Sequence, residues 1–183
     1  PRKIIFPNDD SLKLLNTMEE KIAQLEKNGI DNLIIYPFSK QFSRIPALEY
    51  VRDFLIKELR VSKLVIGYDH QFGKNREGNF EYLKELSGLY DFKVEEIPAH
   101  DLNDVKISST KIRKAILNGN FSKANTFLGY NFSLSGVVTE GKKIGSSIGF
   151  PTANITVSDT DKIIPHEGAY AVFVFVGGKK HKG

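Results

Sequence analysis

The strongest constraint on the fold is the alternation of apolar runs and amphipathic stretches over the first 130 residues. Short apolar runs at residues 31–38, 62–69 and 91–98 predict strands, and stretches with helical spacing lie between and around them. Strands that alternate with helices predict β–α–β units and a parallel, doubly wound sheet. We therefore expect an α/β fold for this part of the chain.

The predicted helices carry apolar residues on one face. In the first of them Thr17 and Glu20 form a capping box, and Asn28-Gly29 ends the helix. The apolar positions of the first three predicted helices are Leu15, Met18, Ile22 and Leu25, then Leu48, Val51, Leu55 and Leu59, then Leu83 and Leu86. Two further short helices are predicted over residues 108–119 and 121–129.

The pattern changes near residue 130. From there glycine-rich turns separate short strands, which predicts an all-β part, a barrel. We therefore expect one domain over residues 1–130 and a second over 131–183. The strand predicted at 169–176 ends at Gly177-Gly178, a turn that predicts a returning partner. Only "KKHKG" follows, so we expect that hairpin to be unfinished.

Composition narrows the class of protein. Hydrophobic residues make up 40% and charged residues 26% of the 183, as in ordinary globular chains. The absence of cysteine excludes a disulfide framework, a thiolate metal site and a cysteine nucleophile. No membrane-length apolar run and no signal-peptide pattern occurs, so we expect a cytoplasmic protein without membrane contact. The net charge of +4 suits small anions and nucleic acid about equally.

The segment "ISSTKIRKAIL" opens a predicted helix with unusual charges. Ser108, Ser109 and Thr110 stand where one capping hydroxyl suffices, and three cations follow them: Lys111, Arg113 and Lys114. Cations oppose the positive end of the helix dipole by about 0.3–1 kcal/mol each. A bound polyphosphate would reverse that sign. Two interpretations stay open here, a phosphate site and a plain serine cap with a solvated basic face.

The loop "GYDHQFGKNREGN" directly follows a predicted buried strand. In open α/β sheets ligands bind at the carboxyl ends of strands. Gly67 would admit a ligand to the backbone, Asp69 would accept from a ribose or an amine, and Arg76 would meet a phosphate. A long turn is the alternative interpretation.

The segment "GKKIGSSIGFPTAN" repeats glycine at every fourth position. Gly141, Gly145 and Gly149 make a loop poor in side chains. Thr152 and Asn154 flank Ala153, so on an extended chain both point to one face. Their hydroxyl and amide oxygens suit Mg²⁺ and phosphate. A turn followed by an edge strand is the alternative.

Taken in order, these three segments resemble the bifunctional prokaryotic riboflavin kinase/FMN adenylyltransferase family, also called FAD synthetase. The loop from Gly67 is similar to the family's G-x-D-x-x-F-G-x-x-R-x-G pattern. The segment "ISSTKIRKAI" is similar to its S-S-T-x-I-R segment, and "PTAN" is similar to the start of its kinase barrel. The resemblance implies a truncated Rossmann-like nucleotidyltransferase domain followed by the start of an all-β riboflavin kinase barrel.

The resemblance also implies two reactions with ATP, riboflavin and FMN as substrates and Mg²⁺ as cofactor. The barrel would phosphorylate riboflavin to FMN, and the α/β domain would adenylylate FMN to FAD. By carry-over, Ser108, Ser109, Thr110 and Arg113 would hold the ATP phosphates of the adenylyltransferase, with Gly67 and Asp69 beside the nucleotide or flavin. Gly141, Gly145 and Gly149 would close over the kinase phosphates, and Thr152 and Asn154 would bind Mg²⁺-ATP.

The chain departs from the family pattern in three ways. It contains no H-x-G-H element, the family's catalytic glutamate lies beyond its last residue, and Gly145-Ser146 stands where many relatives have Gly-Arg. We therefore expect a fragment that catalyses neither reaction. Loss of the first strand would also expose a sheet edge and favour self-association.

Two alternatives remain open. One is another small-molecule adenylyltransferase of the same superfamily, against which the "PTAN" segment argues. The other is a non-enzymatic module that binds nucleic acid through Lys111, Arg113 and Lys114, which the modest, dispersed charge does not favour.

Overall fold

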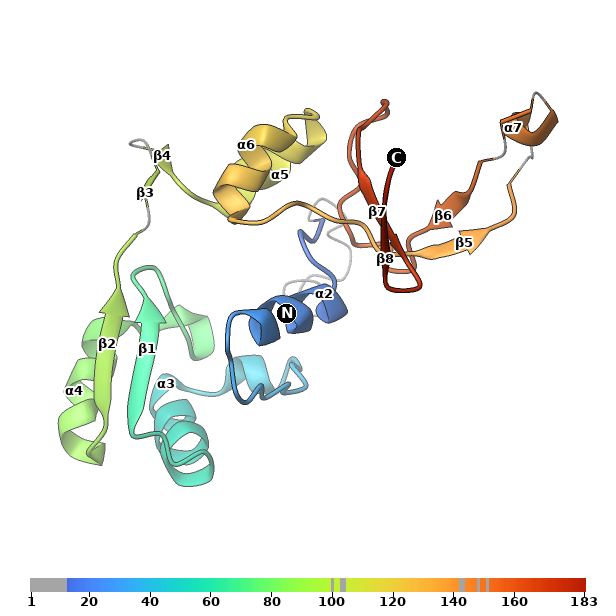
Figure 1. The fold of residues 1–183 in the computed structure, drawn as a ribbon. Coiled ribbons are helices and arrows are strands. Elements are labelled where there is room, and N and C mark those ends of the chain that lie inside the picture. The colour runs from blue at the N-terminus through green and yellow to red at the C-terminus, as the bar shows by residue number, and fades with distance from the viewer. Residues whose placement is uncertain (1–12, 100, 103–104, 142–143, 148, 151) are drawn as a thin grey trace. The chain divides into compact units, whose positions relative to one another are not determined.

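The computed structural model of the chain describes residues 13–99, 101–102, 105–141, 144–147, 149–150 and 152–183. The described chain forms two compact units (Figure 1). The first unit comprises the described residues between 31 and 106. The second comprises those from 13 to 30 and from 107 to 183.

The first unit contains a two-stranded parallel sheet with helices. Strands β1 (Lys63–Gly67) and β2 (Lys93–Ile97) pair in parallel from Lys63 opposite Lys93 to Gly67 opposite Ile97. The other elements are η1 (Phe42–Arg44), α3 (Ala47–Glu49), the π-helix η2 (Tyr50–Glu58), η3 (Lys74–Arg76), α4 (Phe80–Tyr90), and the antiparallel pair β3 (Asp101–Leu102) and β4 (Val105–Lys106). The predicted parallel strand–helix–strand unit is confirmed.

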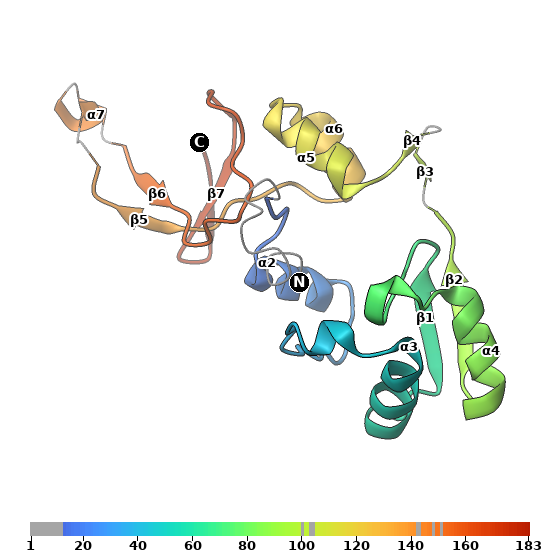
Figure 2. The ribbon, with the colours of Figure 1, turned by 180° about the vertical axis from the view of Figure 1, so that it is seen from behind.

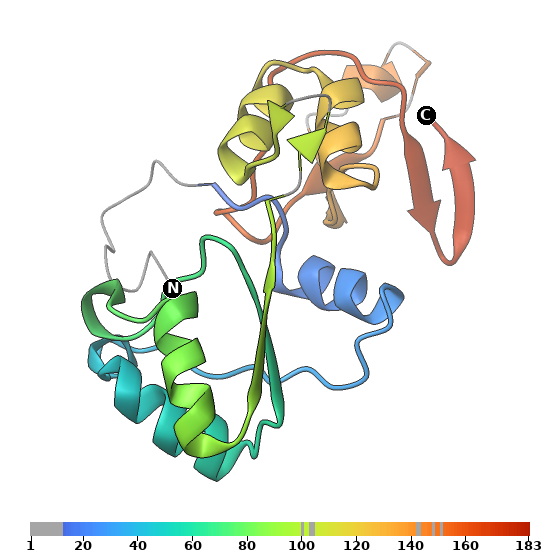
Figure 3. The ribbon, with the colours of Figure 1, turned by 90° about the vertical axis from the view of Figure 1, so that its left-hand side faces the viewer.

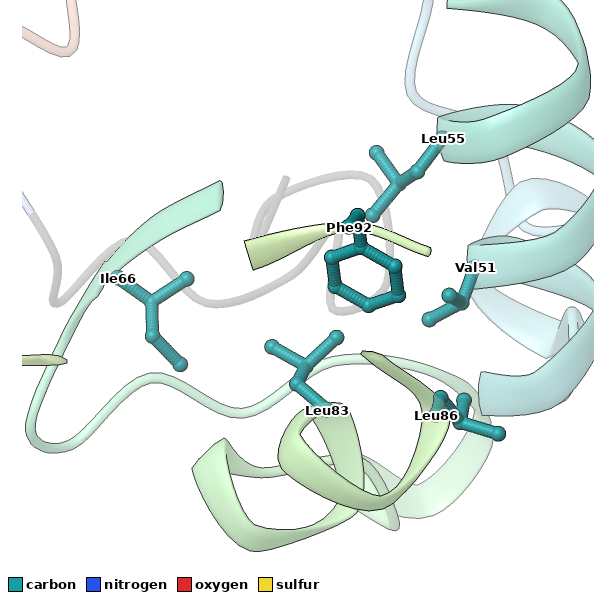
Figure 4. Close-up of a cluster of buried hydrophobic side chains, with 6 residues drawn as sticks. All are labelled: Val51, Leu55, Ile66, Leu83, Leu86 and Phe92. Carbon is teal, nitrogen blue, oxygen red and sulfur yellow. The ribbon is translucent and has the colours of Figure 1, made fainter. Parts of the chain in front are cut away.

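Both longer helices of the first unit cover the same face of the sheet. Figure 2 and Figure 3 show α4 and the continuous α3–η2 helix side by side on one side of β1 and β2. The core lies between these layers and consists of Val51, Leu55, Ile66, Leu83, Leu86 and Phe92 (Figure 4). Burial alternates along β1, where Ile66 faces the helices and Val65 is exposed.

Two predictions for the first unit are wrong. Residues 32–38 do not form the predicted buried strand, and Ile34 and Ile35 are 61% and 58% exposed. A strand needs a paired neighbour, and no strand among the described residues pairs with this segment. Leu48 and Leu59 are also partly exposed, because, of the four predicted apolar positions, the helix buries Val51 and Leu55.

The second unit combines three helices of two or more turns with two antiparallel strand pairs. The helices are α2 (Met18–Lys27), α5 (Ser109–Leu117) and α6 (Phe121–Leu128), and a single turn α7 (Ile144–Ser147) follows. Strands β5 (Val137–Thr139) and β6 (Asn154–Thr156) form one pair, and β7 (Phe173–Val176) and β8 (Lys179–Lys182) form the other. The predicted barrel and the predicted domain boundary near residue 130 stay predictions.

Local signals set the helix ends of this unit. The capping box of α2 is confirmed, since Thr17 Oγ1 accepts from Glu20 N and Glu20 accepts from Thr17 N at 3.0 Å. Helix α6 ends at Gly129, whose φ of +75° favours glycine.

The expectation of an unfinished hairpin is wrong. The residues after Gly177-Gly178 form β8, which pairs with β7 from Phe173 opposite Lys182 to Val176 opposite Lys179. The four residues of β8 are enough to form the second strand of the hairpin, because antiparallel pairing uses backbone groups and does not depend on the side chains.

The segment before α2 packs onto a distant part of the chain. Leu14 N donates to Asp161 O at 2.7 Å, and Ile163 N donates to Leu14 O at 2.8 Å. Ile163 is fully buried with Ile112, Ala115, Ile116 and Ala124. Residues 161–163 thus join the segment before α2 to α5 and α6 in one packed unit.

No helix in the described part of the chain combines the length and the apolarity that a membrane span requires.

Candidate functional site

The first unit carries a pocket of about 840 Å³ beyond the carboxyl end of β1. It is formed by residues 38–50, which lead into and begin the α3–η2 helix, and by the loop that follows β1. Its lining residues are Phe38, Phe42, Ser43, Arg44, Ile45, Tyr50, His70, Gln71, Phe72, Gly73, Lys74, Asn75 and Arg76.

Aromatic rings line this pocket in a continuous series. Ring centroids lie 5.7 Å apart for Phe38 and Phe42, 6.0 Å for Phe42 and Tyr50, and 5.6 Å for Tyr50 and Phe72. The imidazole of His70 stacks on Phe72 at 6.0 Å. Separations of this size are those of favourable aromatic pairs. The pocket therefore offers flat apolar surfaces to a ligand.

Three cations stand at the same pocket. Arg44, Lys74 and Arg76 line it and are exposed. Tyr50 adds a hydroxyl, and burial raises the pKa of this phenol above its ordinary value. Aromatic rings beside cations suit a planar aromatic ligand that carries negative charge.

The loop of the pocket has a strained backbone. Gly73 has φ +75°, and two residues with side chains follow in the left-handed region, Asn75 at +55° and Arg76 at +60°. The left-handed region costs a residue with a side chain about 1–2 kcal/mol, less for asparagine. Gly73 is also required sterically, because a Cβ there would lie 2.8 Å from the Cα and Cβ of Ala47. Such strain is typical of functional loops.

Of the predicted loop residues, the pocket lining includes Arg76 but neither Gly67 nor Asp69. Gly67 is the last residue of β1, and Asp69 is exposed in the turn that follows. A Cβ on Gly67 would meet only Asp69 Oδ1, at 3.7 Å, which is ordinary contact.

The start of α5 belongs to the second unit. Ser108 is its N-cap, and its Oγ accepts from Lys111 N at 3.3 Å. Ser109 and Thr110 are exposed in the first turn. Arg113 is half-buried, and its Nε donates to the backbone oxygen of Lys13 at 2.6 Å. One hydroxyl therefore serves the cap.

The glycine loop packs directly on the two predicted Mg²⁺ ligands. A Cβ on Gly141 would lie 2.6 Å from Asn154 Cγ, and a Cβ on Gly145 would lie 3.1 Å from Thr152 Oγ1. Gly149 has φ +84°, a conformation that favours glycine. The structure thus brings Gly141 to Asn154 and Gly145 to Thr152. Lys142, Lys143, Ile148 and Pro151 of this segment lie outside the described residues.

Hydroxyl and amide groups gather on the neighbouring strands. Asn154 pairs with Thr139 in the β5–β6 register, and the hydroxyls of Thr139 and Thr156 lie 2.9 Å apart. Among the described residues no three histidine or acidic side chains come together to hold a metal. Thr152 and Asn154, which pack on Gly145 and Gly141, carry the hydroxyl and amide oxygens that a hard cation such as Mg²⁺ prefers.

Most aromatic residues of the pocket were not predicted from the sequence. Phe38, Phe42 and Tyr50 come from a segment interpreted only as a strand and a helix. The available signal was the number of aromatic residues between 36 and 54: Tyr36, Phe38, Phe42, Tyr50 and Phe54.

These features define a class of protein, a nucleotidyltransferase-like α/β part followed by a small sheet region. Residues 1–111 match the family model described as FAD synthetase, and residues 128–183 match the model described as riboflavin kinase. The chain belongs to the FAD synthetase family.

The curated relatives of this chain carry names that combine both activities. A bifunctional riboflavin kinase/FMN adenylyltransferase of Buchnera aphidicola (subsp. Schizaphis graminum) is 41% identical over 175 residues, which cover 94% of this chain and 55% of the relative. The protein of that name from Escherichia coli K12 is 35% identical over 176 residues, 96% of this chain and 56% of the relative. The chain spans about half the length of these relatives.

A solved structure supports the fold. It is described as a macrolide-efflux protein from Streptococcus pneumoniae, with 33% identity and a TM-score of 0.82, and the match covers 92% of this chain and 53% of that one.

Proposed function

We propose that this chain is part of an enzyme that makes FAD from riboflavin in two steps. In the first, the γ-phosphoryl group of ATP passes to riboflavin, giving FMN and ADP. In the second, the AMP group of ATP passes to FMN, giving FAD and pyrophosphate. The observation that carries the proposal is the aromatic and cationic pocket of the first unit.

The pocket suits FMN on chemical grounds. The isoalloxazine of FMN is a flat three-ring system, which would stack on rings such as Phe72 and Tyr50. Its phosphate is an anion, which would meet Arg76 or Lys74. Riboflavin shares the rings and lacks the phosphate, so the cations would favour FMN over riboflavin.

For the adenylyl transfer, the exposed start of α5 would receive ATP phosphates. Backbone N–H groups, Ser109, Thr110 and Arg113 would act together there, and Ser108 keeps its capping role. Gly67 and Asp69 at the end of β1 would lie beside the nucleotide. Transfer of this kind depends on positioning and charge stabilisation.

For the kinase step, the loop bearing Gly141, Gly145 and Gly149 would cover the phosphates of ATP. Thr152 and Asn154 would hold Mg²⁺ through their side-chain oxygens. When bound, Mg²⁺ supplies positive charge against the phosphate oxygens. The close contact of glycine with Thr152 and Asn154 supports this assignment, because a side chain at either glycine would displace them.

Small molecules are the partners that this function requires, and we propose the ATP-rich cytoplasm as its place. Another adenylyltransferase is not favoured, since the riboflavin kinase match at 128–183 would have no role in it. Nucleic-acid binding through α5 is not favoured either. Self-association through an exposed edge stays a prediction.

The experiment is an assay of a protein that carries this chain at the full length of its relatives. Given riboflavin and Mg²⁺-ATP, it should produce FMN and then FAD with pyrophosphate. Arg113→Ala should abolish FAD formation from supplied FMN and spare FMN formation, and Thr152→Val should do the reverse. Failure to form either product, or equal loss of both in each variant, would overturn the proposal.

A further inference from the structure

We propose that Glu77 is a positioning residue that holds Arg76 and the loop around it in the ligand-binding conformation. The inference rests on the proposed function, in which this pocket binds FMN. Glu77 occupies a position that the G-x-D-x-x-F-G-x-x-R-x-G pattern leaves open. It does not line the pocket, but its neighbour Arg76 does.

The loop needs an external support because its backbone is strained. Asn75 and Arg76 adopt φ values of +55° and +60°, one after the other. Conformations of this kind persist only where the surrounding structure holds them. Without support the chain would relax to ordinary φ values and the guanidinium of Arg76 would turn away from its present place.

Three tethers hold the loop. At its base Phe72 and Gly78 exchange two backbone hydrogen bonds, of 3.0 and 2.9 Å. Nearer the tip, Lys74 N donates to Ile45 O at 2.8 Å. Beside Arg76, Glu77 Oε1 accepts from Ala47 N at 2.7 Å.

The third tether differs from the others because it depends on a side chain. The backbone tethers would form with many sequences, whereas the bond to Ala47 N requires an acceptor at position 77. Ala47 is the first residue of the α3–η2 helix, and its N–H is one of those that the helix itself leaves unpaired. A carboxylate is also favoured at the positive end of a helix. The hydrogen bond from Ala47 N to Glu77, called the lock below, therefore fixes the loop to the helix that carries Tyr50.

The lock joins the two sides of the pocket. Phe72 and Arg76 lie in the loop, and Tyr50 lies in the helix. A rigid join keeps the stacking rings and the cation at a fixed spacing, which lowers the conformational cost of binding a ligand that uses both. FMN uses both and riboflavin uses the rings alone. Loss of the lock should therefore weaken FMN binding more than riboflavin binding.

The test is titration of FMN and riboflavin with the 183-residue chain, followed by flavin fluorescence. Glu77→Ala should weaken FMN binding about tenfold and riboflavin binding less than threefold. Glu77→Gln keeps an acceptor oxygen and should stay within about threefold of the wild type. Glu85→Ala, at an exposed position of α4, is the matched control and should bind FMN as the wild type does. Thermal unfolding should leave all four proteins within a few degrees of one another.

Limited trypsin digestion gives a readout that does not depend on flavin. Cleavage after Lys74 or Arg76 should be several times faster in Glu77→Ala than in Glu77→Gln, since both lack the charge and only alanine lacks the acceptor. Equal digestion of these two variants, or FMN binding in Glu77→Ala equal to that of the wild type, would overturn the inference alone. Absence of flavin binding by the wild type would overturn the proposed function, and the inference with it.

Discussion

The ammonium group of Lys162 and the carboxylate of Glu20 form a buried ion pair between residues 142 positions apart in the sequence. Lys162 is 2% exposed, and its Nζ also donates to Leu15 O at 2.7 Å and lies 4.6 Å from the centre of the Phe132 ring. The pair ties α2, which belongs to the FAD synthetase match, to a segment of the riboflavin kinase match.

Lys162→Met should lower the free energy of unfolding of the second unit by about 3–5 kcal/mol, because it removes the positive charge that compensates the buried Glu20 carboxylate. Urea denaturation followed by circular dichroism measures this. Lys21→Met, at an exposed position of α2, is the control and should change the free energy by less than about 0.5 kcal/mol. A loss below about 1 kcal/mol in Lys162→Met would show that the pair is not a structural anchor.

The hydroxyls at the start of α5 should separate into two roles. Ser108→Ala removes the cap and should lower the free energy of unfolding by about 1 kcal/mol. Ser109→Ala should leave stability within about 0.5 kcal/mol and reduce FAD formation from FMN in a protein of the relatives' full length. If Ser109→Ala leaves that reaction unchanged, the phosphate role assigned to this hydroxyl is wrong.

Gly145→Ala should damage the kinase step. The new Cβ would press on Phe150 O and Thr152, so one of them must move. In the full-length protein FMN formation should fall at least tenfold, about 1.4 kcal/mol in barrier, with FAD formation from supplied FMN unchanged. Gly88→Ala is the control, since no atom of the described residues lies within 4 Å of the new Cβ and alanine is favoured in a helix. Normal FMN formation by Gly145→Ala would contradict the assignment.

Local sequence signals predicted much of the fold. The capping box of Thr17 and Glu20, the helix end at Asn28, and the buried face of Leu83 and Leu86 each depend on residues a few positions apart. The parallel pairing of β1 and β2 followed from the order of strand and helix. In the glycine loop, Thr152 and Asn154 lie against Gly145 and Gly141, and their predicted role in binding Mg²⁺ and ATP stays a prediction.

Elsewhere the predictions from sequence failed because the structure depends on contacts between residues far apart in the chain. Residues 32–38 have the composition of a strand, yet a strand also requires a neighbour, and sequence pattern cannot supply one. The opposite error occurred at β8, where "KKHK" lacks apolar alternation and pairs through its backbone. The ion pair of Lys162 with Glu20 could not be predicted from the sequence, because each residue alone is typical of a solvated surface.

Of the two segments that line the candidate pocket, only the loop after β1 was predicted from the sequence. Arg76 was expected because its loop follows a strand, at the edge where α/β proteins bind ligands. Phe42 and Tyr50 were not, because their rings meet Phe72 only once the α3–η2 helix packs beside the loop.

Titration of FMN with the 183-residue chain tests the central claim most directly. The account predicts saturable one-site binding with quenched flavin fluorescence, because the isoalloxazine stacks on the pocket rings. Phe72→Ala should weaken that binding about tenfold, and Phe173→Ala, an exposed position of β7, should not change it. Absence of saturable binding, or equal affinity in Phe72→Ala and the wild type, would contradict the claim that this pocket receives the flavin.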